Sequence, residues 1–205
     1  MGDERSTTTA HEERHAGAGR ARLHEAALRL FAEHGVSGTS LQMIADALGV
    51  TKAAVYWHYR TKDEIVLGVL TPVVEDLTGV VETARARRGP RARTEALITG
   101  LVDVVVRRRM VYVVLAGDPF ISELLGKDER LRAVVEEMTD LVAGPGRDEA
   151  QRVSALMFLA GLVGPLNHPA CAAIADDDLR RHLVEGGRRL LLTRAVAKSW
   201  ESRSR

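Results

Sequence analysis

The sequence predicts an all-α protein with a small N-terminal domain and a larger C-terminal domain. Apolar residues recur at helical spacing along most of the chain, and hydrophobic residues make up 45% of its 205 residues. Aromatic residues make up only 4%, and few segments alternate as strands do. The core is therefore expected to be helical and mostly aliphatic.

The N-terminal region is predicted to begin with a tail and one amphipathic helix. Residues 1–15 show no apolar periodicity, so we expect them to be disordered. A helix follows, in which Leu23, Ala27 and Phe31 share one face. Gly35 is expected to end this helix, because glycine readily adopts the left-handed conformation found at helix ends.

Two short helices are predicted next, and a tight turn separates them. Ser40, or alternatively Thr39, is a suitable N-cap for a helix over residues 41–48, and Thr51 is one for a helix over 52–58. Gly49 supplies the left-handed turn between them. Val55 and Tyr59 can face the core, which leaves an unusually aromatic outward face on the second of these helices: Lys52, Ala53, Tyr56, Trp57 and His58.

The remaining chain is predicted to be helical, with loops rich in glycine and proline. A fourth helix runs over 63–87 and is expected to bend at Pro72. Further helices are expected at 91–108, 110–116, 120–125, 128–143, 147–164 and 177–197, with a loop over 165–169. The predicted domains are therefore the tail 1–15, a three-helix domain at 16–62 and a second domain at 63–205.

The three-helix domain has the layout of a helix-turn-helix, in which the second helix of the pair enters the major groove of DNA. Residues 14–62 contain seven Lys or Arg and three acidic residues, a local basic excess that favours DNA binding. Gln42 and Lys52 are long enough to contact base edges. The residues suited to phosphate or sugar contacts are Ser40, Thr51, Tyr56, Trp57, His58 and Lys62.

The stretch from Thr39 to Glu64 resembles the TetR family of bacterial regulators, above all in the run Ala-Val-Tyr-Trp-His-Tyr at 54–59 followed by Lys62. The resemblance covers about residues 20–70 and implies a homodimer, a palindromic operator in double-stranded DNA and a C-terminal ligand pocket.

By motif position, Gln42, Lys52 and Ala53 match base-facing sites. Ser40, Thr51, Tyr56, His58 and Lys62 match backbone-facing sites. Ala53 is too short for hydrogen-bond readout, so specificity is expected to depend on Gln42, Lys52 and the arm around Arg20 and Arg22.

The two long C-terminal helices predicted at 147–164 and 177–197 are candidates for a dimer interface. The first is apolar almost all round, and Gly186 and Gly187 allow close helix approach in the second. An intramolecular core is the alternative. The C-terminal domain is thus expected to serve ligand binding and dimerisation. Most residues around the expected ligand pocket should be ordinary core. The candidates for lining it are Leu70, Leu77, Leu101, Val105, Tyr112, Phe120, Met138, Met157, Phe158, Asn167 and His168.

These patterns predict a cytoplasmic DNA-binding regulator. The resemblance to the TetR family further implies that it is a ligand-responsive repressor, released from DNA by a small-molecule effector. An activator and a non-sensing DNA-binding protein are the alternatives. An enzyme is disfavoured, because the chain has no nucleophile elbow or phosphate-binding glycine loop, and we expect no cofactor or metal. No membrane partner is expected either, because Gly and Pro interrupt the long uncharged run at 153–175.

Overall fold

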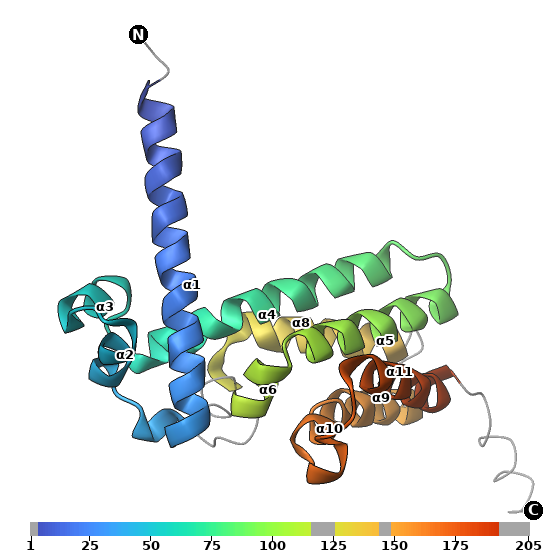
Figure 1. Ribbon diagram of the computed structural model, residues 1–205. Coiled ribbons are helices and arrows are strands. Elements are labelled where there is room, and N and C mark those ends of the chain that lie inside the picture. Colours follow the sequence, from blue (N-terminus) through green and yellow to red (C-terminus); the bar gives the residue numbers. More distant parts are fainter. Residues whose placement is uncertain (1–3, 116–125, 144–148, 193–205) are drawn as a thin grey trace, which may run out of the picture. The chain divides into compact units, whose positions relative to one another are not determined.

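The computed structural model describes residues 4–115, 126–143 and 149–192, and every regular element in these ranges is a helix (Figure 1). The predicted all-α fold is confirmed. The predicted helix at 120–125 and the C-terminal end of the last one lie outside the described residues. The helices are α1 Glu4–Gly38, α2 Leu41–Leu48, α3 Lys52–His58, α4 Lys62–Arg85, α5 Pro90–Arg107, α6 Arg109–Leu115, α8 Glu129–Ala143, α9 Glu149–Gly161, α10 Gly164–Asn167 and α11 Asp176–Leu192, with a 3-10 turn at Pro169–Cys171.

The chain divides into two compact units. The N-terminal unit comprises Met1–Pro72 and Val113–Lys127, and the C-terminal unit comprises Val73–Tyr112 and Asp128–Arg205. The division falls within α4, so the N-terminal unit includes the first part of this helix as well as the predicted helix-turn-helix.

Helix α1 is longer than the sequence predicted. It begins at Glu4, whereas residues 1–15 were expected to be disordered. Once a helix is nucleated, each further residue adds a hydrogen bond, so a helix can extend into polar sequence that has no apolar stripe. The predicted stop at Gly35 is confirmed, because this residue interrupts the helix with φ 72° and ψ 164°.

The core of the N-terminal unit lies where α1, α2 and α3 meet the beginning of α4. Ile44 and Ala45 of α2 are fully buried, as is Val55 of α3. These small and branched side chains leave little room for rearrangement, because protein cores pack as densely as organic crystals. The other buried apolar residues of this unit are Leu23, Ala26, Ala27, Phe31, Val36, Ile65, Val66, Val69 and Leu70.

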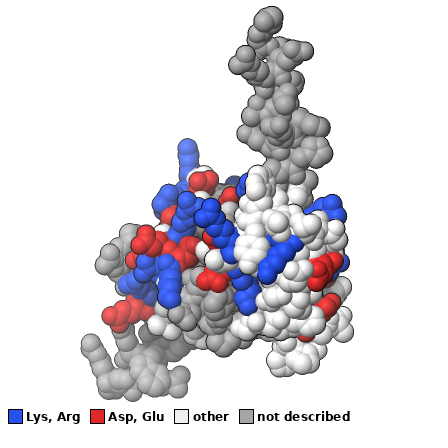
Figure 2. Space-filling view, turned by 90° about the vertical axis from the view of Figure 1, so that its left-hand side faces the viewer, with Lys and Arg blue, Asp and Glu red and all other residues white. Residues whose placement is uncertain are grey.

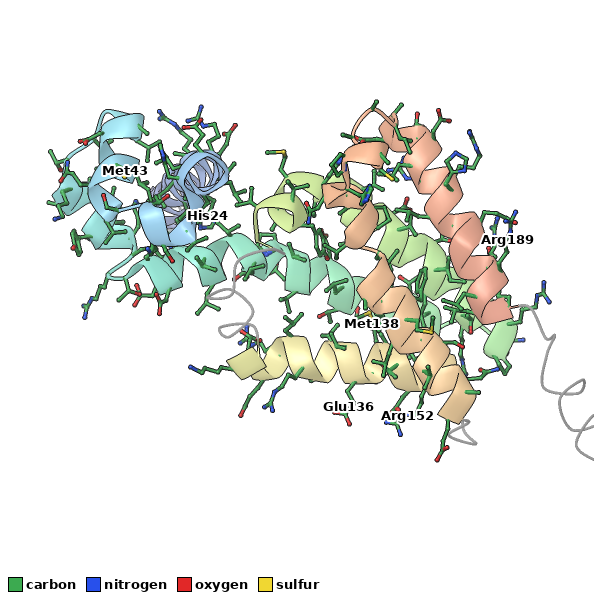
Figure 3. The ribbon with its side chains drawn as sticks, turned by 90° about the horizontal axis from the view of Figure 1, so that it is seen from below. His24, Met43, Glu136, Met138, Arg152 and Arg189 are labelled. Carbon is green, nitrogen blue, oxygen red and sulfur yellow. The ribbon has the colours of Figure 1, made fainter. Side chains whose placement is uncertain are left out.

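The C-terminal unit is built around α5, which packs against α8 and α11, while α9 packs against α8 and α11 (Figure 3). Met138 lies buried on the side of α8 that faces α9, whereas the nearby Glu136 points away from it. The core is aliphatic, as the composition predicted, and includes Leu97, Ile98, Leu101, Val102, Val104, Val105, Val106, Ala155, Phe158, Leu162, Leu166 and Leu179.

The segment after α9 differs from the prediction. Helix α9 ends at Gly161 rather than at 164, and residues 165–167, predicted as part of a loop, belong to the short helix α10. Pro165 occupies the first turn of α10 and Pro169 the first turn of the 3-10 helix. Proline is well suited to a first turn, where its missing N–H costs nothing, so two prolines here start short helices instead of excluding them.

Among the described residues, no helix combines the length and the apolar character that crossing a membrane requires.

Candidate DNA-binding interface

The turn between α2 and α3 sets the geometry of the candidate interface. Gly49 adopts φ 66° and ψ 30°, and its N–H donates to the carbonyl oxygen of Asp46 at 3.1 Å. The N–H of Val50 donates to the carbonyl oxygen of Ala45 at 3.0 Å. The left-handed glycine therefore satisfies the last carbonyls of α2 and reverses the chain into α3, as the sequence predicted.

Both predicted N-caps form. The hydroxyl oxygen of Ser40 accepts from the N–H of Met43 at 3.2 Å, and that of Thr51 accepts from the N–H of Ala54 at 3.2 Å. Each hydroxyl still has its own O–H to donate, and both residues are exposed. The caps thus fix the start of each helix while leaving a hydrogen-bond donor for a phosphate.

The outward face of α3 is aromatic and basic. Trp57 is 77% exposed and Tyr56 is 43% exposed. The ammonium group of Lys52 lies 5.6 Å from the centre of the Tyr56 ring, within the range of a cation–π contact. Ala53 is exposed beside them, as predicted. Figure 2 shows the molecule from the side on which α3 lies in Figure 1, where Lys and Arg side chains are interspersed with uncharged and acidic residues.

His58 differs from its neighbours, because it is half-buried rather than fully outward. Its ring meets the Trp57 ring edge-on, with centroids 4.8 Å apart. It also lines a hollow of about 120 Å³ between α1, α2 and α3, together with Arg22 and the apolar Leu23 and Val50. His58 is therefore held between the core and the exposed face.

Gln42, the predicted base-contacting residue of α2, is exposed and hydrogen-bonded within its own helix. Its side-chain Nε2 donates to Oδ1 of Asp46, one turn later, at 2.7 Å. Sequence reasoning did not identify Asp46, although a spacing of four residues on a helix places two side chains next to each other.

Lys62 has structural partners that the sequence did not reveal. Its Nζ donates to the carbonyl oxygens of Ser37 and Thr39, each at 3.2 Å. These carbonyls lie after the break in α1, where the helix cannot satisfy them itself. Lys62 therefore joins the start of α4 to the segment between α1 and α2, in addition to any phosphate contact.

Thr39 reinforces the same segment. It is 2% exposed, and its hydroxyl lies 2.8 Å from the carbonyl oxygen of Gly35 and 3.2 Å from that of Leu30. The sequence allowed either Ser40 or Thr39 as the cap of α2. The structure assigns the cap to Ser40 and uses Thr39 to tie down the end of α1.

Tyr59 is half-buried and joins α1 to the end of α3. Its hydroxyl lies 2.6 Å from Nε2 of His24 on α1. Burial lowers the pKa of His24, and the positive charge of Arg20 lowers it further. A Cβ at Gly68 of α4 would lie 2.6 Å from the Tyr59 hydroxyl oxygen and 2.7 Å from Nε2 of His24, so a side chain there would displace the two groups of this hydrogen bond.

The predicted pocket residues are distributed unevenly. Asn167, His168 and Met157 are exposed in the isolated chain, and Phe120 lies outside the described residues. Tyr112 is half-buried. Burial raises the pKa of its phenol to about 12, and the negative charge of Asp76 contributes to this increase. The others are buried: Leu70 in the N-terminal unit, and Leu77, Leu101, Val105, Met138 and Phe158 in the C-terminal unit. Their role in ligand binding stays a prediction.

Tyr112 lies near an acidic group held by two arginines. Asp76 Oδ2 lies 3.0 Å from Nε of Arg108 and 3.1 Å from an amino nitrogen of Arg107. Burial alone would raise the pKa of Asp76, but hydrogen bonds from Arg108 and Arg107 outweigh it and lower this pKa. The C-terminal unit thus contains a charged cluster that joins α4 to the junction of α5 and α6.

Helices α9 and α11 expose apolar side chains that the isolated chain does not cover. Val153 is 56% exposed, Leu156 50% and Met157 59%, all on α9, and Leu190 of α11 is 38% exposed. Large apolar side chains gathered in this way typically mark an interaction surface. They lie on the two helices that the sequence predicted for a dimer interface.

Comparison with known proteins agrees with this geometry. The family model described as "Bacterial regulatory proteins, tetR family" matches residues 23–69. The chain is 45% identical over 130 residues to the HTH-type transcriptional regulator AcrR of Shigella flexneri, covering 60% of each chain. It is 39% identical over 85 residues to the probable acrEF/envCD operon repressor of Escherichia coli strain K12, covering 40% of this chain and 39% of the relative. The chain therefore spans less than two thirds of either relative.

Solved structures show the same fold. A TetR-like transcriptional regulator from Rhodococcus sp. RHA1 superposes with a TM-score of 0.64 at 19% identity, covering 85% of this chain and 96% of that one. At this identity the likeness establishes the fold alone. The curated relatives are transcriptional regulators rather than enzymes.

Proposed function

We propose that this chain, which belongs to the TetR family of bacterial regulatory proteins, represses transcription by binding a palindromic operator as a homodimer and leaves the operator when a small molecule binds its C-terminal unit. The observation that carries the proposal is the exposed face of α3. Trp57 is 77% exposed and lies beside the half-exposed Tyr56, so folding buries little of its apolar surface. A binding partner best explains its placement.

The residues around Trp57 support DNA as that partner. Lys52 and Tyr56 offer a cation and a hydroxyl on the same face, and the capping hydroxyls of Ser40 and Thr51 are free to donate. Phosphate contacts of this kind position a protein on the duplex, and long polar side chains then contact the bases. Gln42 and Lys52 are the base-reading candidates of α2 and α3.

A homodimer is supported by the exposed apolar side chains of α9 and α11. A palindromic operator has two half-sites about 34–36 Å apart, so a second copy must present a second α3. Pairing α9 and α11 with the same helices of another copy would bury Val153, Leu156 and Met157 in a four-helix bundle.

The protein is proposed to act in the cytoplasm.

An effector site is proposed for the C-terminal unit. The buried aliphatic residues around Leu101 and Met138 offer an apolar lining, and the phenol of Tyr112 is a candidate polar anchor. An effector releases DNA only if it binds one conformation of the dimer better than the other. Helix α4 contributes residues to both units, so it is the proposed lever between the effector site and the DNA-binding face.

Selection from random DNA, followed by affinity measurements, tests the proposal. The purified chain should enrich one palindromic sequence. Tyr56→Ala should weaken binding to it by about 10-fold or more, because a hydrogen bond to a charged phosphate contributes roughly 1.5–3 kcal/mol. Trp57→Ala should also weaken binding.

Met110→Ala is the matched control, because Met110 is also apolar and 57% exposed but lies on α6. It should leave the affinity unchanged. Failure to enrich any sequence, or equal losses in Met110→Ala and Trp57→Ala, would contradict the proposal.

The effector is tested separately. A compound that raises the thermal midpoint of the C-terminal unit should lower operator affinity in the same concentration range, because both effects report one binding event. A compound that stabilises the protein and leaves operator binding intact would place the regulation elsewhere.

A further inference from the structure

We infer that Asp46 is a positioning residue that fixes the side-chain amide of Gln42 in one orientation, and that it thereby makes Gln42 a reader of adenine. The inference rests on the proposed function, because it assumes that α2 approaches DNA. Its basis is the hydrogen bond of 2.7 Å from Nε2 of Gln42 to Oδ1 of Asp46, made between two exposed residues of α2.

The chemistry of the pair permits only one arrangement of the amide. A carboxylate at neutral pH accepts hydrogen bonds and cannot donate them, whereas an amide has an NH₂ end that donates and an oxygen end that accepts. Turning the Gln42 amide over would bring its oxygen against the carboxylate oxygen of Asp46. The amide therefore keeps its nitrogen on the side of Asp46.

The groups that remain available match one base. With one N–H taken by Asp46, Gln42 retains its oxygen as an acceptor and its second N–H as a donor. Adenine presents an N6 donor and an N7 acceptor side by side in the major groove, which is the complementary pair. Guanine presents two acceptors at the same positions, so a fixed amide can satisfy only one of them.

Preorganisation gives the pair its effect on specificity. A free glutamine side chain can adopt several rotamers and either amide orientation, and it must lose that freedom when it binds a base. The bond to Asp46 restricts the amide before DNA arrives. Helix α2 itself is held rigidly at this point, because Ile44 and Ala45 on its inner side are fully buried and Ser40 caps its first turn.

The charge of Asp46 has an opposite and separable effect. A carboxylate on a surface that approaches DNA repels phosphates whatever the base sequence. Loss of this charge should therefore strengthen binding to all DNA, while loss of the hydrogen bond should weaken discrimination at one base pair. Two substitutions separate these effects.

The test uses the full chain and compares four proteins by selection from random DNA: the wild type, Gln42→Ala, Asp46→Ala and Asp46→Asn. Gln42→Ala identifies the base pair that Gln42 reads. At that base pair, Asp46→Ala should reduce the preference for adenine by about 3- to 10-fold, the effect of one net hydrogen bond. Asp46→Asn can accept from Gln42 or donate to it, so it keeps a hydrogen bond but permits both amide orientations. It should retain only part of that preference while binding all sequences more tightly.

The outcomes discriminate between the inference and the proposed function. A wild-type chain that enriches no sequence contradicts the proposed function and the inference with it. A wild-type chain that enriches a site, with the same base preferences in Asp46→Ala, overturns the inference alone. The inference is also overturned if the base lost in Gln42→Ala is not adenine, or if Asp46→Asn keeps the full adenine preference of the wild type.

Discussion

Single residues hold the N-terminal unit in the shape that DNA binding would require. Two lysines of this unit have different roles, although they are the same residue type. Lys52 extends from α3 over the Tyr56 ring at the exposed face. Lys62 is half-buried and donates to the carbonyl oxygens of Ser37 and Thr39. The motif predicted DNA contacts for both, because a motif records residue types and not the partners that tertiary structure supplies. The carbonyls that Lys62 binds lie more than twenty residues earlier, beyond the reach of helical periodicity.

Replacing each lysine should therefore have a different result. Lys62→Ala should lower the free energy of unfolding by about 1.5 kcal/mol, because it removes charge-assisted hydrogen bonds to two backbone carbonyls. Lys52→Ala should change that free energy by less than about 0.5 kcal/mol, as expected for an exposed side chain, and should weaken operator binding. Chemical denaturation and DNA affinity measured on both variants check this. Equal stability of the two variants would show that the Lys62 hydrogen bonds contribute nothing.

His24 should make the stability of the protein depend on pH. Its pKa is lowered below the ordinary 6.5 by burial and by Arg20, so between the folded and unfolded pKa values the unfolded chain binds more protons. The contribution of His24 is therefore present above pH 6.5 and is lost as pH falls through the folded pKa. His24→Gln can keep a hydrogen bond to the Tyr59 hydroxyl without titrating.

Urea unfolding of the wild type and His24→Gln, followed from about pH 7.5 to about pH 5, measures this effect. The stability of the wild type relative to the variant should decrease as the pH falls. A difference that stays constant over this range would exclude His24 as the source of any pH dependence.

At the scale of helices, local signals predicted most of the structure and close packing decided the rest. The caps Ser40 and Thr51 and the turn at Gly49 form as predicted, because each depends on neighbouring residues alone. Gly186 and Gly187 are adjacent in α11 and indistinguishable by sequence. Only Gly187 is closely packed: a Cβ there would lie 2.6 Å from Cε2 of Phe158 and 2.9 Å from Cγ2 of Ile98, whereas a Cβ at Gly186 would meet nothing within 4 Å.

Gly187→Ala should therefore lower the free energy of unfolding by about 1–3 kcal/mol, the usual cost of adding a methyl group to a packed core. Gly79→Ala is the matched control, because Gly79 is also a helical glycine and a Cβ there would meet nothing within 4 Å. It should raise stability by up to about 1 kcal/mol through helix propensity. Thermal unfolding of the two variants measures both effects, and a Gly187→Ala protein as stable as Gly79→Ala would refute the packing argument.

At the scale of the whole molecule, the exposed apolar side chains of α9 and α11 predict assembly. The sequence identified the two helices from their apolar character but could not say which residues an intramolecular core would use. The structure shows that Ala155 and Phe158 of α9 are buried within the chain, while Val153, Leu156 and Met157 are left exposed. The pocket was less predictable, because residues that line a cavity and residues that fill a core have the same aliphatic composition.

Met157→Glu should convert a dimer into a monomer of 22.4 kDa, because a charge at a buried apolar interface is costly to desolvate. Met110→Glu is the control, since Met110 is nearly as exposed but lies on α6. Sedimentation equilibrium distinguishes the two variants. A Met157→Glu chain that remains dimeric would exclude this part of α9 from the interface.

The affinity of the purified wild-type chain for its selected DNA site and for a scrambled site of the same composition, measured over a range of salt concentrations, tests the central claim most directly. The account predicts that the selected site binds about 10³-fold or more tightly than the scrambled one, and that both affinities fall steeply with salt as counterions are released. Equal affinity for the two sites, or binding that salt does not weaken, would contradict the claim that α2 and α3 form a sequence-specific DNA-binding surface.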